Sequence, residues 1–596
     1  MMSRTKVTLC IVCLLQIPLL YADSGPSYLL KFKTYLDWSQ HLPIKPNPAF
    51  LTFVSQTSPL SQKLRERWLY EVARTKDWTT YTKYYQPSED RSLQCYAQMA
   101  LLEQGLRQEI IPSLNQLWLT TSPDPTPCSR LFSRLMNEGI IDEALLTKRL
   151  ILALDQHLLP LATNLLKQYS PPRFDEVSTL LLIHKNPSQI TALTPTTRHQ
   201  EFYLYGLKRM IASHINEAIQ LFQETKTKQF LDNTQKQRFL VQIALYKAMR
   251  NQPDATLWFQ KVNPAFYTDS LLEWEIRYAL NQRQWAKVEQ LIQKLHDQEN
   301  PCWHYWLARS LDEQGKHTAA TTIYQSIAST RNYYGFLASR RLNKTLSFES
   351  EETLQNPRLL SAYLPLIEQI KALYRSNQTG QASRLLNDFS SELPKDEKIA
   401  LAQWVATELK WYGKSISFSN TDELNNQLSL RFPLAYQRLI LTFSKIYQVP
   451  QALIYAIIRQ ESAFREDATS SAGAKGLMQL MPATAHVVSK QNRIHYASHQ
   501  QLFSAQNNIE LGAAYLKGLS KHYHHHPLLM AAAYNAGPKQ VANWLKNTPP
   551  KDIDIWIETL PWPETRNYLK NIIAFYAVYQ YRLSEKPNLS PFMRDI

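Results

Sequence analysis

Glycine is scarce in this sequence, with 13 residues in 596, against the roughly 7% usual for proteins. Few glycines mean few tight turns at positive φ, whereas Leu, Ala, Gln and Lys, which favour helices, are abundant. This balance argues against a strand-rich fold and predicts a mainly α-helical protein. At 596 residues the chain is too long for one hydrophobic core, so we expect two to four domains.

Cysteine is also rare, and only Cys95, Cys128 and Cys302 lie beyond the N-terminal apolar run. In an oxidising compartment one pair can form a bridge and leave one thiol free. Cys95 and Cys128 flank a segment long enough for two antiparallel helices, which would bring the chain back near its start, so we favour this pair. Three cysteines without a matching set of histidines do not indicate zinc, and no Asp-x-Asp-x-Asp-Gly calcium loop occurs. No metal site or cofactor is predicted, and the histidines at 522–526 are interpreted as a solvated helix end.

Long hydrophobic runs are missing except at the N-terminus. There Arg4 and Lys6 precede an apolar run from Val7 to Leu20, and Tyr21-Ala22-Asp23 follows. This layout is typical of a secretory signal peptide, here residues 1–22 with cleavage after Ala22. The alternative, a membrane anchor, is disfavoured because a span needs roughly 20 apolar residues. We therefore expect an exported protein without a membrane span after processing.

Acidic residues are outnumbered, with 50 Asp and Glu against 66 Lys and Arg, a formal net charge of +16. Removing residues 1–22 takes two positive charges and leaves +14. Residues 441–596 hold 16 basic and 10 acidic side chains, close to their share, so the charge is spread along the chain. Such a balance favours diffuse attraction to an acidic polymer. Export and the lack of basic runs argue against nucleic acid as the partner.

The pattern along the chain predicts three regions after the signal peptide. Residues 23–345 read as helix after helix with short polar breaks, and the large-small-aromatic spacing around 274–324 is similar to a tetratricopeptide repeat, which predicts an α-superhelix. Residues 346–435 contain Ser-, Asn- and Glu-rich breaks and are interpreted as a small helical linker domain. Residues 436–596 carry the motifs with chemical content.

Glu461 is the first of these candidates. The preceding stretch from Val449 to Ile458 is apolar nearly all round and predicts a helix opened by Pro450. Apolar neighbours and the negative end of the helix dipole both favour a protonated carboxyl, which is what a general acid near neutral pH requires. The plainer alternative is a solvated glutamate at a helix end.

Three further motifs follow in the sequence. Gly473–Pro482 is a tight turn with the single amide Gln479, Ala531–Pro538 is an alanine-rich helix end with Tyr534, and Leu560–Tyr568 opens the last helix. Taken singly, each has an ordinary structural interpretation: a satisfied core glutamine, a core aromatic residue, or an acidic helix start.

Taken together, their order and spacing resemble soluble lytic murein transglycosylases. That lysozyme-like family is marked by Glu-Ser, Gly-Leu-Met-Gln-x-Met-Pro, Ala-Tyr-Asn-Ala-Gly and Glu-Thr-Arg-x-Tyr blocks, and all four occur in order within 459–568. Similarity at Phe432–Tyr436 and Tyr333–Ala338 extends the resemblance to the large members. It implies a superhelical, U-shaped or ring-like region, a linker domain and a C-terminal lysozyme-like α+β catalytic domain.

The resemblance also implies the chemistry. Glu461 would be the sole catalytic acid and base, cutting the β-1,4 bond between N-acetylmuramic acid and N-acetylglucosamine and leaving 1,6-anhydro ends without consuming water. The substrate would be periplasmic peptidoglycan and the enzyme a monomer, with other cell-wall enzymes as further partners. Arg465 departs from the family, which has Asn or Asp there. The positions that match residues of the family's glycan groove are Ser470, Met478, Gln479, Tyr534, Asn535 and Glu564.

A single carboxylate is the feature that separates the alternatives. Ordinary glycosidases use two carboxylates, roughly 5–5.5 Å or 6.5–9.5 Å apart. After Glu461 the nearest candidates are Glu466 and Asp467, in a turn-like segment. A one-carboxylate site suits an internal nucleophile. A hydrolytic muramidase of goose-lysozyme type would need a placed water and a second acid, and a helical scaffold with an idle catalytic domain would have no use for a buried acid.

Overall fold

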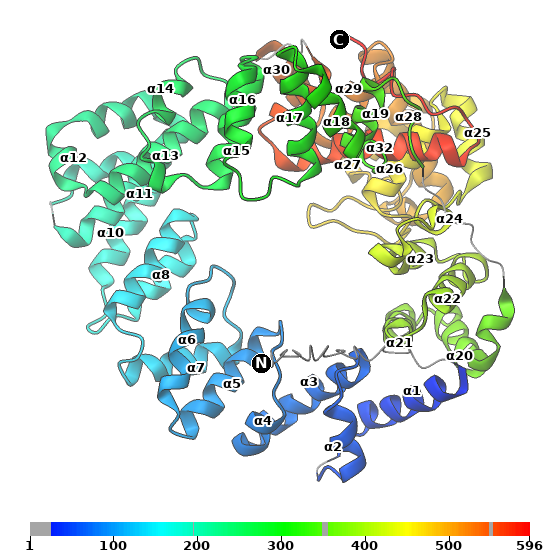
Figure 1. Cartoon of the computed structure of the whole chain (residues 1–596), viewed down its shortest axis with the longest axis horizontal. Coiled ribbons are helices and arrows are strands. Elements are labelled where there is room, and N and C mark those ends of the chain that lie inside the picture. Colours follow the sequence, from blue (N-terminus) through cyan, green and yellow to red (C-terminus); the bar gives the residue numbers. More distant parts are fainter. Residues whose placement is uncertain (1–24, 44, 195, 349–355, 548–551, 596) are drawn as a thin grey trace, which may run out of the picture. The chain divides into compact units, whose positions relative to one another are not determined.

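The computed structural model describes residues 25–43, 45–194, 196–348, 356–547 and 552–595. The predicted signal peptide, residues 1–22, lies outside this part. The described chain is almost entirely helical, and its only β structure is two isolated bridges, Thr469 with Lys475 and Lys475 with Leu480 (Figure 1). The mainly α-helical prediction is confirmed. None of the described helices combines the length and apolar character that crossing a membrane requires.

The chain divides into two compact units that are not consecutive in sequence. The first unit joins residues up to Glu71 with Leu354–Leu409, and α1 packs beside α21 because both present aromatic side chains. Tyr28 donates a hydrogen bond to the Phe389 carbonyl at 2.5 Å, and Lys31 pairs with Glu392 at 2.6 Å. Its elements are α1 (Gly25–Gln40), α2 (Pro48–Val54), α3 (Pro59–Arg74), η3 (Pro357–Tyr363), α20 (Leu364–Arg375), α21 (Thr379–Ser390) and α22 (Lys395–Thr407).

The second unit contains Val72–Thr353 and Lys410–Ile596. Its first part is a succession of helical pairs in which sequence neighbours pack against each other (Figure 1). The elements are α4 (Trp78–Tyr84), α5 (Arg91–Glu103), α6 (Arg107–Trp118), α7 (Thr126–Asn137), α8 (Glu143–Asp155), α9 (Leu159–Lys167), α10 (Phe174–Lys185), η1 (Pro187–Ala192), α11 (Thr197–Gln223), α12 (Thr225–Phe230), α13 (Asn233–Met249), α14 (Ala255–Phe259), η2 (Pro264–Phe266), α15 (Asp269–Asn281), α16 (Trp285–Ile292), α17 (Pro301–Glu313), α18 (His317–Ile327) and α19 (Tyr333–Arg341).

The linker stretch 346–435 is shared between the two units. Its helices η3 to α22 belong to the first unit, whereas the segment from Lys410 belongs to the second, where Tyr412 contacts Tyr436 edge to face. The first helices of the chain pack against the apolar faces of η3 to α22, and no local sequence pattern predicts that long-range pairing. The predicted boundaries at 345 and 435 therefore stay predictions.

Cys95 on α5 and Cys128 on α7 form a disulfide, with their Cα atoms 5.1 Å apart. The bridge closes over α6, so the helical pair between the cysteines does return the chain to its start. Cys302 is a free, buried thiol.

The C-terminal part of the second unit is built around α26, whose residues Ala452–Ile458 are all buried. Such a helix is apolar on every side because neighbouring helices surround it, above all α32. The elements are α23 (Tyr412–Ser419), η4 (Asp422–Leu424), α24 (Leu428–Arg431), α25 (Gln437–Tyr447), α26 (Gln451–Glu461), α27 (Pro482–Asn492), η5 (His499–Phe503), α28 (Ala505–His522), α29 (Pro527–Ala536), α30 (Pro538–Asn547), α31 (Ile553–Thr559) and α32 (Pro563–Arg582).

A buried ion network joins this part to the helical pairs before it. Glu558 on α31 is 0% exposed, and its carboxylate contacts Lys570 on α32 at 2.8 Å and Arg277 on α15 at 3.3 Å. Tyr334 on α19 donates its hydroxyl to the same carboxylate at 2.7 Å. The network therefore ties α32 to both α15 and α19.

Candidate active site

Glu461 is the last residue of α26, and its carboxylate is held by one neighbour. The Tyr568 hydroxyl on α32 donates to Glu461 Oε1 at 2.8 Å. Burial raises the pKa of Glu461 to about 7, an effect that the Tyr568 hydrogen bond opposes and the charge of Glu564 reinforces. A carboxyl with this pKa is part protonated at neutral pH, so it can act both as an acid and, after losing its proton, as a base.

The chain turns sharply as soon as it leaves this helix. Ala463 and Phe464 both adopt a positive φ, 49° and 63°, which is uncommon for residues other than glycine. The Phe464 ring is buried and lies parallel to Tyr436 at 6.5 Å between centroids. The packed ring stabilises the strained turn, and the turn ends α26 directly after its carboxylate.

A cavity of about 580 Å³ borders Glu461. Its lining includes Arg431, Arg459 and Arg465, and among the described residues Glu461 is its only carboxylate. Burial and the neighbouring guanidiniums of Arg331 and Arg459 lower the pKa of Arg431 to about 10. The cavity is thus electropositive around a single acid, which suits an anionic substrate. Arg465, where the sequence departs from the family pattern, is exposed at this cavity.

Two of the predicted groove residues line the same cavity. Gln479 donates its amide to the carbonyls of Ala468 at 3.1 Å and Gly476 at 2.8 Å, which leaves its side-chain oxygen as an acceptor. Ser470 is exposed, and its hydroxyl accepts a hydrogen bond from the Ala474 amide at 3.0 Å. Both are positioned by the turn that follows Glu461 in sequence.

Met478 and Tyr534 are not among the residues that line this cavity. The Met478 side chain is 0% exposed, and its sulfur fills the space beside Gly512 that a Cβ there would occupy. The Tyr534 hydroxyl donates to the Met478 carbonyl at 2.7 Å, so the phenol is bonded to backbone and not to Glu461. The Met478 side chain therefore packs in the core, where the absence of a Cβ on Gly512 leaves room for its sulfur.

Asn535 and Glu564 lie where α29 meets α32. Thr565 donates its hydroxyl to the Asn535 side-chain oxygen at 2.8 Å, which ties the end of one helix to the start of the other. Glu564 is exposed in the first turn of α32, and its charge acts on the Glu461 carboxyl. These residues, with Glu461, Ser470 and Gln479, form one neighbourhood.

Tyr568 is the functional residue that the sequence left unassigned. It lies four residues after Glu564, one helical turn further on the same face of α32. The signal available in the sequence was a tyrosine one helical turn after Glu564, an acid that the motifs already assign to the site. It did not identify which of Tyr534 and Tyr568 bonds Glu461.

We expect Tyr568→Phe to shift the pH–activity profile upward. The hydroxyl lowers the pKa of Glu461, so its loss raises that pKa and moves the high-pH limb to higher pH. A hydrogen bond to a charged group contributes about 1.5–3 kcal/mol, so the maximal rate should fall roughly tenfold or more. The measurement is the initial rate of the catalysed reaction between pH 5 and 9. Tyr534→Phe is the matched control, and an equal shift in that variant would contradict the assignment.

The fold and the site define a class of protein: a mainly helical domain with one carboxyl of raised pKa in an electropositive cleft. Residues 438–557 match the family model described as the transglycosylase SLT domain. The soluble lytic murein transglycosylase of Escherichia coli (strain K12) is 28% identical over 544 residues, 89% of this chain and 84% of that protein. The putative soluble lytic murein transglycosylase of Haemophilus influenzae is 30% identical over 57% of each chain.

Solved structures agree with the sequence comparisons. An inactive Glu-to-Gln mutant of lytic transglycosylase Slt from Pseudomonas aeruginosa has a TM-score of 0.79 at 29% identity, covering 95% of both chains. The 70-kDa soluble lytic transglycosylase in complex with bulgecin A has a TM-score of 0.70 at 26% identity, covering 94% of this chain and 93% of that chain. The chain is thus homologous to soluble lytic murein transglycosylases over nearly its whole length, and it carries their SLT domain.

Proposed function

We propose that this protein is a lytic transglycosylase that cleaves the β-1,4 bond between N-acetylmuramic acid and N-acetylglucosamine in peptidoglycan. The observation that carries the proposal is a single carboxyl, Glu461, with a pKa of about 7 in a cleft that has no other acid among its described lining residues. The homology over nearly the whole chain supports the same reaction.

Glu461 acts first as the general acid. Its proton goes to the glycosidic oxygen, the bond from that oxygen to C1 of the muramoyl residue breaks, and the N-acetylglucosamine leaves with a free hydroxyl. The hydrogen bond from Tyr568 then stabilises the carboxylate that remains. The substrate's own N-acetyl group stabilises the positive charge at C1.

Glu461 acts next as the base. Its carboxylate takes the proton of the muramoyl 6-hydroxyl, O6 forms a bond to C1, and the 1,6-anhydro ring closes. The proton lost in the first half is regained in the second, so no water is consumed and the enzyme returns to its starting state. A pKa of about 7 suits both halves of the reaction, because the protonated and the ionised carboxyl are both populated at neutral pH.

The surrounding residues bind or position. Gln479 offers its side-chain oxygen and Ser470 its hydroxyl to sugar hydroxyl and N-acetyl groups, whereas Glu564 contacts the glycan at the start of α32. Asn535, Tyr534 and Met478 hold the walls of the groove through the hydrogen bonds described above. A periplasmic location, export through residues 1–22 and action as a monomer belong to the same proposal.

Muropeptide analysis tests the proposed reaction against hydrolysis. Purified murein is digested with the protein, and the products are identified by mass spectrometry. Anhydromuramoyl ends are the expected result. Reducing ends heavier by one water would instead identify a hydrolytic muramidase, and the absence of any release would leave a binding scaffold.

A further inference from the structure

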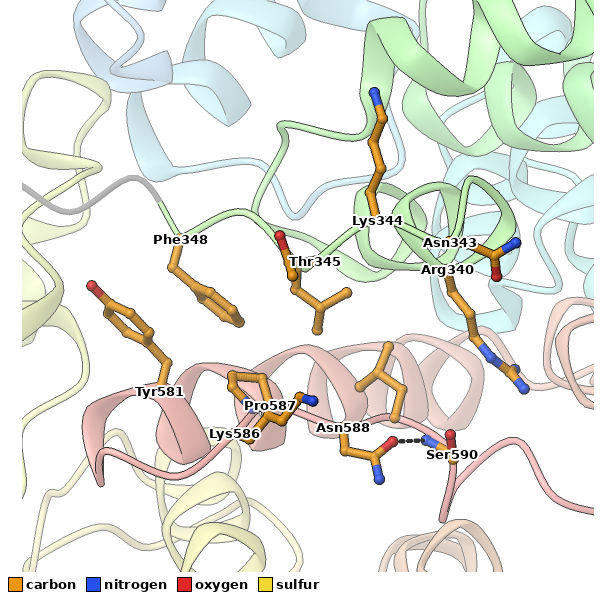
Figure 2. Close-up of a pocket in the computed structure, with 12 residues that line it drawn as sticks. Arg340, Asn343, Lys344, Thr345, Phe348, Tyr581, Lys586, Pro587, Asn588 and Ser590 are labelled. Atoms are coloured by element: carbon orange, nitrogen blue, oxygen red, sulfur yellow. Dashed lines mark hydrogen bonds between the residues drawn. The ribbon is translucent and has the colours of Figure 1, made fainter.

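A second cavity lies away from Glu461, between the segment that follows α19 and the segment that follows α32. Its volume is about 590 Å³. Figure 2 shows the two segments facing each other, with the rings of Phe348 and Tyr581 at one end and Arg340 and Ser590 at the other. Tyr581 follows Tyr568 by thirteen residues on α32, about 20 Å at 1.5 Å per residue, so this cavity is not part of the catalytic cleft.

One wall of the cavity is aromatic. The Phe348 and Tyr581 rings are stacked, with centroids 4.7 Å apart and planes within 6°. Tyr581 is nonetheless 42% exposed. An exposed ring beside a cavity offers a flat apolar surface to a ligand.

The charge of the cavity has one sign. Arg340, Lys344 and Lys586 line it, and no carboxylate does among the residues that the structure describes. Arg340 also borders a neighbouring cavity, where Asp554 is paired with Arg341 and Asp552 with Arg283. The third carboxylate there, Asp595, lines that neighbouring cavity and not this one. In Figure 2 Lys344 extends away from the gap, which leaves Arg340 and Lys586 as the remaining lining cations.

Neutral polar side chains complete the lining, and one of them, Asn588, is fixed by two hydrogen bonds. The Asn588 side-chain oxygen accepts from the Ser590 amide at 2.9 Å, and the Asn588 amide nitrogen of the backbone donates to Gln580 at 2.8 Å. In Figure 2 the side-chain nitrogen of Asn588 points away from the gap. The neutral polar side chains of the lining can donate and accept, so its distinguishing feature is the presence of cations without a carboxylate among the described residues.

We propose that this cavity binds the carboxylates of a peptidoglycan stem peptide, and that it is a non-catalytic anchor for the substrate. Two cations and an apolar ring, with no carboxylate among the described lining residues, fit a short peptide with several carboxylates better than a neutral glycan, which has no charge to pair with them. A membrane surface fits less well, because the apolar surface is recessed in a cavity between two segments. The choice of stem peptide, and not another polyanion, rests on the proposed function.

Peptide binding tests this site independently of cleavage. The probe is the free tripeptide L-alanyl-γ-D-glutamyl-diaminopimelate, which has no glycosidic bond, measured by titration calorimetry with the full chain. Arg340→Gln with Lys586→Gln should weaken binding about tenfold, because exposed ion pairs are modest individually. Arg340→Lys with Lys586→Arg should retain binding, and a tripeptide with amidated carboxylates should bind more weakly than the free acid.

The control double variant is Lys490→Gln with Lys521→Gln, which removes the same charge from exposed last-turn lysines of α27 and α28. It should bind the tripeptide as the unchanged protein does. Equal affinity of the Arg340/Lys586 and control variants, or no binding by the unchanged protein at millimolar peptide, would overturn the site. So would a loss confined to phosphatidylglycerol vesicles, which would point to a lipid surface. If the tripeptide binds and no anhydro ends form, only the proposed function fails.

Discussion

Replacing Glu461 with glutamine is expected to lower the rate of murein cleavage by at least about a thousandfold. General acid–base catalysis by one group contributes typically 10²–10⁴-fold, and here the same carboxyl serves both halves of the reaction. The Glu461→Gln side chain keeps the shape of the glutamate, and its amide oxygen can still accept the Tyr568 hydrogen bond, so the fold and glycan binding should survive. The measurement is the initial rate of anhydromuropeptide release by mass spectrometry.

Asp467→Asn is the matched control for this change. It removes a carboxylate six residues further on that is exposed and does not line the cavity. That variant should keep its activity. Substantial residual turnover in Glu461→Gln would contradict the assignment of Glu461 as the acid. Loss of activity in both variants would instead indicate a general effect of charge near the turn.

Glu461→Gln, which lowers the activity, is expected to raise the stability of the protein at high pH. The folded-state pKa of Glu461, about 7, is above its ordinary value of 4.5, so the charged form is disfavoured in the fold. Its stability contribution is fully present below about pH 4.5 and is lost as pH rises through 7. A shift of this size corresponds to on the order of 3 kcal/mol. Glu461→Gln should therefore unfold at a higher temperature than the unchanged protein at pH 8.5, and at a similar temperature at pH 4.

The central helix and its acid could be predicted from the sequence because their signals are local. The apolar run Val449–Ile458 needs only its own residues to indicate a helix surrounded by others, and Pro450 marks its start. The position of Glu461 at the end of that helix then follows from helix length. The fold class followed in the same way from scarce glycine and from repeated helical pairs.

Side-chain partners across long sequence distances could not be predicted in this way. Tyr534 and Tyr568 both belong to motifs near the site. Only the packing of α32 against α26 decides that Tyr568, and not Tyr534, donates a hydrogen bond to Glu461. Met478 turned inward because Gly512, on another helix, leaves room for its sulfur. The pairing of α1 with α21 joins residues separated by 361 positions, as in the contact of Tyr28 with Phe389.

The buried network around Glu558 determines how firmly α32, and with it Tyr568, is held. Burial favours the neutral form of Glu558, but the charges of Lys570 and Arg277 outweigh it and hold the pKa at about 2. The Glu558 carboxylate is fully buried, so the loss of one partner leaves a buried charge uncompensated, which costs about 3–5 kcal/mol. The pKa depression corresponds to a similar magnitude, on the order of 3 kcal/mol.

Glu558→Gln is accordingly expected to destabilise the protein by about 3 kcal/mol at pH 7, measured as a lower urea midpoint in near-UV circular dichroism. Because the folded pKa is depressed, the stabilisation exists above the ordinary value of 4.5 and disappears as pH falls through about 2. The difference between variant and unchanged protein should therefore shrink as the pH is lowered from 5 to 2.5. Glu273→Gln is the control: it removes the other carboxylate on Arg277, at 3.0 Å but 37% exposed, and should cost less than about 1 kcal/mol. Equal losses in the two variants would show that the enclosed carboxylate holds α32 no more firmly than a surface ion pair does.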